Sequence, residues 1–158
     1  MKPVVHIDAV PLIESAKGEV YAERYAALGE AVGASKLGYN VTIVPPGKRS
    51  CPLHNHHVNE EMFLILAGEG TYRFGDASYP VKTGDIMAAP AGGRETAHHL
   101  INTGAVDLKY LSVSTMIDPE ICEYPESDKF LVNSPGTGKP FRYIGRMANS
   151  LDYFDGEI

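Results

Sequence analysis

Cysteine is scarce in this chain, and so are long apolar runs. The 158 residues include two cysteines, Cys51 and Cys122, which are too few for a disulfide framework. We therefore expect a reduced, cytoplasmic protein. No apolar run approaches the roughly 18–20 residues that a bilayer-spanning helix needs, so we expect no membrane partner. Asp8 precedes any long apolar stretch, which disfavours a secretory signal.

Positive charge is also in short supply. Fourteen lysines and arginines stand against 20 acids, for a net charge of −6. General nucleic-acid binding normally needs a basic face, so nucleic acid is not an expected partner. A local arginine can still bind an anionic small molecule. The length is that of a single domain, 1–158, and the 16 glycines and 11 prolines indicate many tight turns.

Short alternating stretches dominate the middle of the chain. Leu37, Tyr39, Val41 and Ile43 share one face of a strand that ends at Pro45-Pro46-Gly47. Further short stretches then recur about every ten residues, separated by Gly- and Asp-containing turns. This rhythm predicts an all-β fold, an antiparallel barrel or jelly roll. The expected strands are 61–67, 71–74, 78–81, 86–89, 98–102 and 106–115, and Met62, Leu64, Leu66 and Met87 are expected in the core.

The two ends are less regular. We expect a barrel core at 37–116, an N-terminal arm at 1–36 and an irregular C-terminal extension at 117–158, whose aromatic tail packs on the barrel. Residues 4–12 suit an edge strand or an arm lying across a neighbouring molecule. Residues 19–31 contain helix-favouring alanines and glutamates, but close glycines and irregular apolar spacing favour strand and loop.

One segment carries a metal-binding pattern, GKRSCPLHNHHVNEEMFLILAG at 47–68. His54 and His56 are two residues apart, so on an extended chain their side chains point to the same side. Glu61 follows at the head of an apolar run, where a second strand can bring it alongside. Two neutral imidazoles and a carboxylate are common ligands of first-row metals. A fourth candidate, His98, lies in PAGGRETAHHLIN at 90–102.

This segment resembles the first motif of the cupin superfamily, G-x(5)-H-x-H-x(3,4)-E-x(6)-G. The matching residues are Gly47, His54, His56, Glu61 and Gly68, with six residues instead of five after Gly47. The second motif, G-x(5)-P-x-G-x(2)-H-x(3)-N, is matched by the later segment. There, five residues instead of two separate Gly92 from the histidine.

The second motif is matched by Gly84, Pro90, Gly92, His98 and Asn102. The three-residue insertion leaves His98 and the adjacent His99 as alternatives, and His98 keeps the spacing to Asn102. Asn102 itself suits a structural role, tying a turn by side-chain-to-backbone hydrogen bonds.

The resemblance implies a cupin double-stranded β-helix, a jelly-roll barrel with one cupin domain. It implies a divalent transition metal, Mn, Fe, Ni or Zn, held by His54, His56, Glu61 and His98. The chain looks like the small uncharacterised cupins, some of them loosely labelled sugar-phosphate isomerases.

Other residues near the motifs have two interpretations each. Cys51 offers a thiolate ligand, but a lone cysteine is more often a small buried hydrophobe. His57 and Glu60 should point away from the metal on an extended chain. Arg94 in the insertion suits a substrate phosphate or carboxylate, or else a solvated loop.

Glu95, Arg94 and Tyr72 are the candidates for catalysis. Tyr72 and Arg73 alternate on a strand, so one of them should enter the barrel. An inward tyrosine suits a proton donor, and an inward arginine suits an anionic substrate.

Three functions fit this pattern. The preferred one is a metal-dependent enzyme acting on a small polar carbohydrate-like molecule, specifically a sugar-phosphate isomerase. The alternatives are an Fe(II) dioxygenase and a non-catalytic protein that binds or senses a small ligand. Open sheet edges and the apolar N-terminal arm favour a homodimer.

Overall fold

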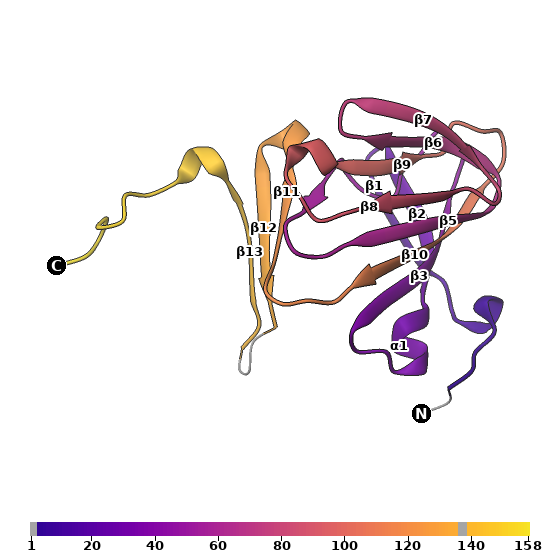
Figure 1. Cartoon of the computed structure of the whole chain (residues 1–158), viewed down its shortest axis with the longest axis horizontal. Coiled ribbons are helices and arrows are strands. Elements are labelled where there is room, and N and C mark those ends of the chain that lie inside the picture. The colour runs from indigo at the N-terminus through magenta and orange to yellow at the C-terminus, as the bar shows by residue number, and fades with distance from the viewer. Residues whose placement is uncertain (1–2, 136–138) are drawn as a thin grey trace.

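Antiparallel strands make up about half of this computed structural model, which describes residues 3–135 and 139–158 (Figure 1). One short α-helix, α1 (Leu28–Val32), and four 3-10 turns accompany them within these ranges. The strands are β1 (Ile13–Lys17), β2 (Tyr21–Ala27), β3 (Leu37–Val44), β4 (Asn55–His56), β5 (Glu61–Ala67), β6 (Glu69–Phe74), β7 (Ala77–Lys82), β8 (Ile86–Ala89), β9 (His98–Ile101), β10 (Leu108–Thr115), β11 (Glu120–Tyr124), β12 (Lys129–Ser134) and β13 (Phe141–Arg146).

Two of the sheets form the barrel. The larger has the order β1-β2-β3-β10-β5-β8, and the smaller has the order β7-β6-β9. Strands distant in sequence become neighbours, since β10 pairs with both β3 and β5. This crossing order is that of a jelly roll, so the expected all-β double-stranded β-helix is confirmed.

Strand β5 turns one face into the barrel, and it is not the face that the sequence analysis expected. Phe63 and Ile65 are buried, whereas Met62, Leu64 and Leu66 are only half-buried, so placing these three in the main core was wrong. Side chains alternate along a strand, and Glu61 therefore points inward with Phe63 and Ile65. Met87 is buried as expected.

A second apolar cluster lies beneath the N-terminal segment. Ala26, Leu28 and Val41 form its centre, with Ile7 and Val10 packed against it. Residues 4–12 contain the 3-10 turn η1 (Ile7–Ala9) instead of the expected edge strand. The edge of the larger sheet is β1. In the 19–31 segment, the strand is confirmed as β2, and the remainder forms α1 instead of loop.

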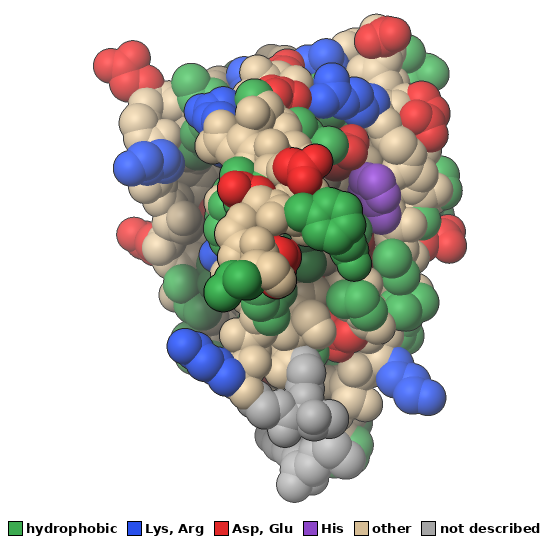
Figure 2. All heavy atoms as spheres, turned by 90° about the vertical axis from the view of Figure 1, so that its left-hand side faces the viewer, with side chains coloured by type: hydrophobic (Ala, Val, Ile, Leu, Met, Phe, Trp, Pro, Cys, Tyr) green, Lys and Arg blue, Asp and Glu red, His purple; other side chains and the backbone are tan. Residues whose placement is uncertain are grey.

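The C-terminal part is more regular than expected, because β11, β12 and β13 form a sheet with β4 beside the barrel (Figure 1). The last residues then leave the body of the molecule, so the prediction that the tail packs on the barrel was wrong. Leu151, Tyr153 and Phe154 are more than two-thirds exposed, at 75%, 87% and 71%. Figure 2 looks at this face, where apolar and acidic side chains gather near the viewer.

Gly68 joins β5 to β6 in a backbone conformation that side chains rarely adopt, with φ of 83°. A Cβ atom there would lie 2.5 Å from the backbone oxygen of Asp107, the residue just before β10. The glycine therefore allows β10 to pass close to the turn. In the described part of the chain, no helix has the length and apolar character needed to cross a membrane.

Candidate metal centre

Backbone pairing brings the two histidine-containing segments together. His54 pairs with His98, and each backbone N–H donates to the other residue's carbonyl, at 3.2 and 2.8 Å. His56 lies in β4, where it pairs with Cys122 of β11. Glu61 is the first residue of β5 and points inward. Three different strands and one connecting segment therefore aim their side chains at one end of the barrel.

The four side chains offer a compact set of donor atoms, all within 4.8 Å of one another. The Oε2 atom of Glu61 lies 3.0 Å from Nε2 of His98, 3.3 Å from Nε2 of His56 and 3.9 Å from Nε2 of His54. The side chains are no more than 17% exposed. Little water can therefore compete for these donors.

A second layer of contacts sets the orientation of each imidazole. Nδ1 of His54 lies 3.0 Å from the carbonyl oxygen of Pro52, and Nδ1 of His98 lies 3.0 Å from that of Thr96. A carbonyl only accepts hydrogen bonds, so each Nδ1 carries a proton, and in the neutral imidazole Nε2 is then the nitrogen with the lone pair. This is the arrangement found for metal-ligating histidines.

The site has the donors that a metal ion requires. Nε2 of His98 and Oε2 of Glu61 lie 3.0 Å apart, a distance at which either a shared proton or a common cation can hold them together. Nε2 of His56 is buried and has no hydrogen-bond partner in the described ranges. A cation among these atoms would satisfy them all, and adjacent donors of an octahedral ion with bonds of about 2.1 Å lie about 3.0 Å apart. The residues therefore fit a first-row divalent ion, with positions left for water or substrate.

The same contacts control protonation. Burial, followed by the charge of His98, lowers the pKa of His54 to about 4. Burial opposes the charged form of His56, but contacts with Cys122 and Glu61 outweigh it and raise its pKa to about 10. Burial favours neutral Glu61, yet its contacts with His56 and His98 hold its pKa well below the usual range. The carboxylate of Glu61 is thus ionised, the form that binds a metal, and His56 must release its proton when it ligates one.

Two residues that contact His56, Cys122 and Glu120, were not predicted from the sequence as part of the site. Nδ1 of His56 lies 3.3 Å from Sγ of Cys122 and 3.6 Å from Oε2 of Glu120. The Glu120 carboxylate is buried and accepts hydrogen bonds from the backbone N–H groups of Val58, Asn59 and Ile121. Both residues are more than 60 positions away from His56 in the sequence, so no local pattern could predict the contact. Only the pairing of β4 with β11 brings them next to His56.

His99 does not join the cluster. On β9 it lies opposite Arg73 of β6, whereas His98 lies opposite Phe74, so the two histidines have opposite faces. His99 is nevertheless 2% exposed, and neither ring nitrogen has a hydrogen-bond partner among the described residues. Burial and the charge of Arg49 lower its pKa to about 4. His99 is therefore a buried neutral residue next to the site.

Tyr72, and not Arg73, points into the barrel. The Tyr72 ring is 6.2 Å from that of His98, but its hydroxyl donates to the backbone oxygen of Ala88 at 3.0 Å. Burial raises its pKa above the usual range. Arg73 points outward and pairs with Glu126 at 2.5 Å. The tyrosine therefore packs beside the centre with its hydroxyl already engaged.

The insertion in the second motif forms the 3-10 turn η2 (Arg94–Thr96) and faces outward. Arg94 is 58% exposed and lies 3.2 Å from Asp128. The Glu95 carboxylate accepts a hydrogen bond from the N–H of Gly93, and backbone hydrogen bonds lower its pKa. Both of these catalytic candidates, Arg94 and Glu95, therefore form their contacts away from the metal centre.

The remaining motif residues have structural contacts. The Asn102 side chain donates to the carbonyls of Val44 and Val106 and accepts from the N–H of Gly104, which confirms its role in tying the turn. Two neighbours of the ligands, His57 and Glu60, point away: the first lies 3.4 Å from Glu123, and the second is exposed.

A hollow of about 220 Å³ adjoins three of the four donor residues, His54, Glu61 and His98. Cys51 lines it but is not part of the donor cluster. Burial raises the pKa of the Cys51 thiol to about 12, so it remains neutral. Besides His54, Glu61 and His98, the lining residues are Glu23, Thr42, Ser50, Cys51, Phe63, His99, Leu100, Tyr110 and Ser112. Glu23, from the N-terminal arm, is a further acidic residue that the analysis of the sequence missed.

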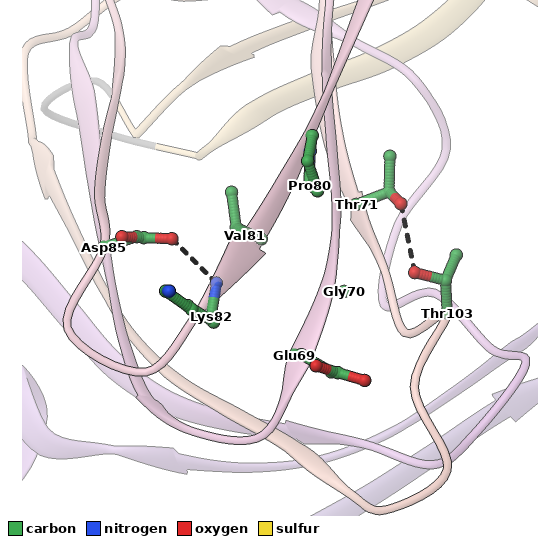
Figure 3. A pocket seen from close by; sticks show the side chains of 8 residues that line it. All are labelled: Glu69, Gly70, Thr71, Pro80, Val81, Lys82, Asp85 and Thr103. Carbon is green, nitrogen blue, oxygen red and sulfur yellow. Dashed lines mark hydrogen bonds between the residues drawn. The ribbon is translucent and has the colours of Figure 1, made fainter.

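A larger hollow of about 420 Å³ lies near the other end of β5 (Figure 3). Its charged side chains, Glu69, Lys82 and Asp85, have no histidine beside them, and Asp85 binds the backbone N–H of Lys82 at 2.8 Å. Thr71 and Thr103 hydrogen-bond to each other at 3.0 Å. The donor cluster therefore identifies the smaller hollow as the candidate functional site.

Fold and site together define a jelly-roll barrel with a three-histidine, one-glutamate cluster inside one end. Residues 40–114 match the family described as Cupin domain. This part of the chain is therefore a cupin domain.

Two curated proteins each match a little under half of this chain. The oxalate-binding protein of Thermotoga maritima is 35% identical over 74 residues, which are 47% of this chain and 58% of that protein. The chain spans a little over half the length of the curated relatives it matches, 58% and 54%.

Solved structures resemble a larger share of the chain. A provisionally assigned sugar phosphate isomerase from Acidithiobacillus ferrooxidans is 29% identical, with a TM-score of 0.74 over 83% of this chain and 80% of that chain. A cupin from Silicibacter pomeroyi, described as a sugar phosphate isomerase, has a TM-score of 0.80 over 97% of this chain and 98% of that chain. At 23% identity, it shows the shared fold.

Proposed function

We propose that this cupin is a metal-dependent enzyme that isomerises a small carbohydrate-like carbonyl compound. The observation that carries the proposal is the cluster of His54, His56, Glu61 and His98 beside a small polar hollow. The sugar phosphate isomerase names of two structural neighbours support this chemistry. The sequence predicted a sugar phosphate as the specific substrate, and the assay below compares free with phosphorylated sugars.

The four side chains would hold Mn, Fe, Ni or Zn. A bound divalent ion polarises a carbonyl group and makes the neighbouring carbon-bound hydrogen more acidic. The protein would contribute the rest: walls that exclude water, hydroxyl groups that orient the substrate, and a group that moves the proton. Isomerisation needs such a group within reach of the substrate.

The test is metal analysis followed by an isomerase assay. Protein purified without added metal or nickel affinity resin would be analysed by plasma mass spectrometry, beside His56→Ala. We expect near-stoichiometric metal in the wild type and loss in the variant. The metal-loaded protein would then be offered small aldoses and ketoses, free and phosphorylated, with product detection by chromatography. A wild type that takes up no metal even after reconstitution would exclude this function.

Binding without catalysis is the second candidate, favoured by the oxalate-binding relative from Thermotoga maritima. Oxalate titrated into the metal-loaded protein would release heat if it binds at the centre, and a failed isomerase assay would then leave binding as the function. The Fe(II) dioxygenase alternative makes a separate prediction. Iron as the native metal, together with oxygen consumption in the presence of substrate, would support it over isomerisation.

A further inference from the structure

Glu23 lines the hollow at the metal centre from the side of β2. On this strand Tyr25 lies opposite Thr42 of β3, which in turn lies opposite Tyr110 of β10. Thr42 and Tyr110 are buried in the barrel. Residues two apart on a strand share a face, so Glu23 points to the same side as Tyr25 and therefore inward. The same hollow contacts Glu61, which places both carboxylates on its walls.

Among the described residues, the carboxylate of Glu23 has neither a hydrogen-bond nor an ion-pair partner. The adjacent Arg24 points to the other face and pairs with Asp107 at 2.6 Å. Burial raises the pKa of the Glu23 carboxyl above its usual range. An unpaired carboxylate in a half-buried position destabilises the fold, and such groups concentrate where a protein uses them.

The other walls of the hollow offer hydroxyl groups. Ser50 Oγ and Tyr110 Oη lie 2.8 Å apart, and Thr42 and Ser112 line the same space. No lysine or arginine in the described ranges lines it, so a phosphate group would have no cationic partner there beyond the metal. The volume of about 220 Å³ is below the roughly 300–1,000 Å³ of most ligand sites, which suits a molecule of a few carbon atoms.

We propose that Glu23 is the catalytic residue that moves the proton, and that the hollow accepts small uncharged hydroxycarbonyl compounds in preference to their phosphate esters. The inference rests on the proposed isomerase function and narrows its substrate class. Glu23 removes the proton from the carbon next to the carbonyl. The C–H electron pair forms the carbon–carbon double bond of an enediolate, and the π pair of the carbonyl moves onto its oxygen. Glu23 returns the proton to the former carbonyl carbon, while the hydroxyl proton moves between the two oxygens. No oxidant or reductant is consumed.

The experiment compares wild type, Glu23→Gln and Glu14→Gln after reconstitution with Mn²⁺. Glutamine keeps the size of the side chain and cannot accept the proton. Glu14 is the matched control, because it lies on the exposed strand β1 of the same hairpin and does not line the hollow. Each protein is incubated with dihydroxyacetone in D₂O, and deuterium bound to carbon is measured by mass spectrometry against a protein-free sample. Manganese content is measured in parallel.

We expect Glu14→Gln to exchange at the wild-type rate and Glu23→Gln to exchange about 100-fold or more slowly, as loss of a general base typically costs 10²–10⁴-fold. Both should retain manganese. Exchange by Glu23→Gln within a few-fold of wild type would overturn the catalytic role. Loss of manganese from Glu23→Gln would also overturn it, because Glu23 would then support the metal.

A binding measurement separates this inference from the proposed function. Calorimetric titration with dihydroxyacetone and with dihydroxyacetone phosphate needs no turnover. If Glu23 faces the substrate, Glu23→Gln should improve the affinity for the phosphate ester relative to the neutral compound by about tenfold, since a like charge is removed. An unchanged ratio, or a wild type that prefers the phosphate ester, would overturn the substrate class. A wild type that binds dihydroxyacetone without exchanging it would overturn the isomerase function and the proton transfer but not the binding preference.

Discussion

His98 and Glu61 face each other across the inside of the barrel, with Nε2 and Oε2 3.0 Å apart. On its other side, the His98 ring is fixed by the carbonyl of Thr96, 3.0 Å from Nδ1. The imidazole therefore cannot turn away from the carboxylate without losing that hydrogen bond. A rigid pair of this kind presents two ligands without an entropic cost on metal binding.

His98 should be needed for metal retention, and the adjacent His99 should not. Loss of a residue that only hydrogen-bonds to a metal ligand typically lowers metal affinity by roughly 10–100-fold. His98→Ala removes a ligand itself, so we expect its metal affinity to fall by at least that factor. His99→Gln keeps the donor cluster and should retain metal. Plasma mass spectrometry of both variants, dialysed against a fixed chelator concentration, gives the comparison. Metal loss in His99→Gln with a preserved far-ultraviolet spectrum would contradict the assignment.

Glu120 should stabilise the connection between the metal centre and the C-terminal sheet. Its carboxylate accepts three backbone hydrogen bonds, from Val58, Asn59 and Ile121. Glu120→Ala leaves these donors unpaired and should lower the free energy of unfolding by about 3 kcal/mol. Glu120→Gln keeps one acceptor oxygen and should lower the free energy of unfolding by about half as much as Glu120→Ala. Urea denaturation measures both, and Glu126→Ala on the exposed surface is the control. Equal stabilities for Glu120→Ala and wild type would refute this role.

Tyr110 should make the protein sensitive to alkaline conditions. Burial raises its pKa well above the usual range, so the folded protein keeps the phenol neutral where the unfolded chain ionises it. The contribution to stability is complete below about pH 10 and is lost as the pH rises further, at about 1.4 kcal/mol per pH unit for one group. Thermal unfolding between pH 8 and pH 11 measures the slope.

Tyr110→Phe removes the titrating group and should flatten this slope. Tyr79→Phe is the control, because Tyr79 is 52% exposed. A variant that loses stability with pH as steeply as the wild type would show that other groups cause the alkaline effect.

The homodimer expected from the sequence stays a prediction, and the C-terminal tail gives it a test. Leu151, Tyr153 and Phe154 are exposed in the single chain, and burying an aromatic side chain removes about 150–250 Å² from water. We expect a dimer by light scattering, which a chain ending at Arg146 should form less tightly. Asp152→Ala/Asp155→Ala, which leaves the apolar side chains, is the control. A full-length monomer at high micromolar concentration would refute the prediction.

The sequence by itself determined the class of fold and the four candidate ligands. Local periodicity and turn glycines are carried by adjacent residues, so the strands from 37 to 115 were predictable, apart from their exact ends. The spacing of His54, His56 and Glu61 relates residues on neighbouring extended segments, where geometry follows from the strand period. Gly68 was recognisable for the same reason, as the turn that only a residue without a Cβ can form.

Tertiary structure decided which face of each strand is inside, because alternation gives two faces but not their assignment. It placed Phe63 and Ile65 in the core instead of Met62 and Leu64, and it selected Tyr72 over Arg73 and His98 over His99 as the inward residues. The other contributions to the site come from distant segments: Glu23 from β2, and Glu120 and Cys122 from β11. Pairing between strands that are far apart in sequence depends on the packing of the whole barrel, and no local pattern records it.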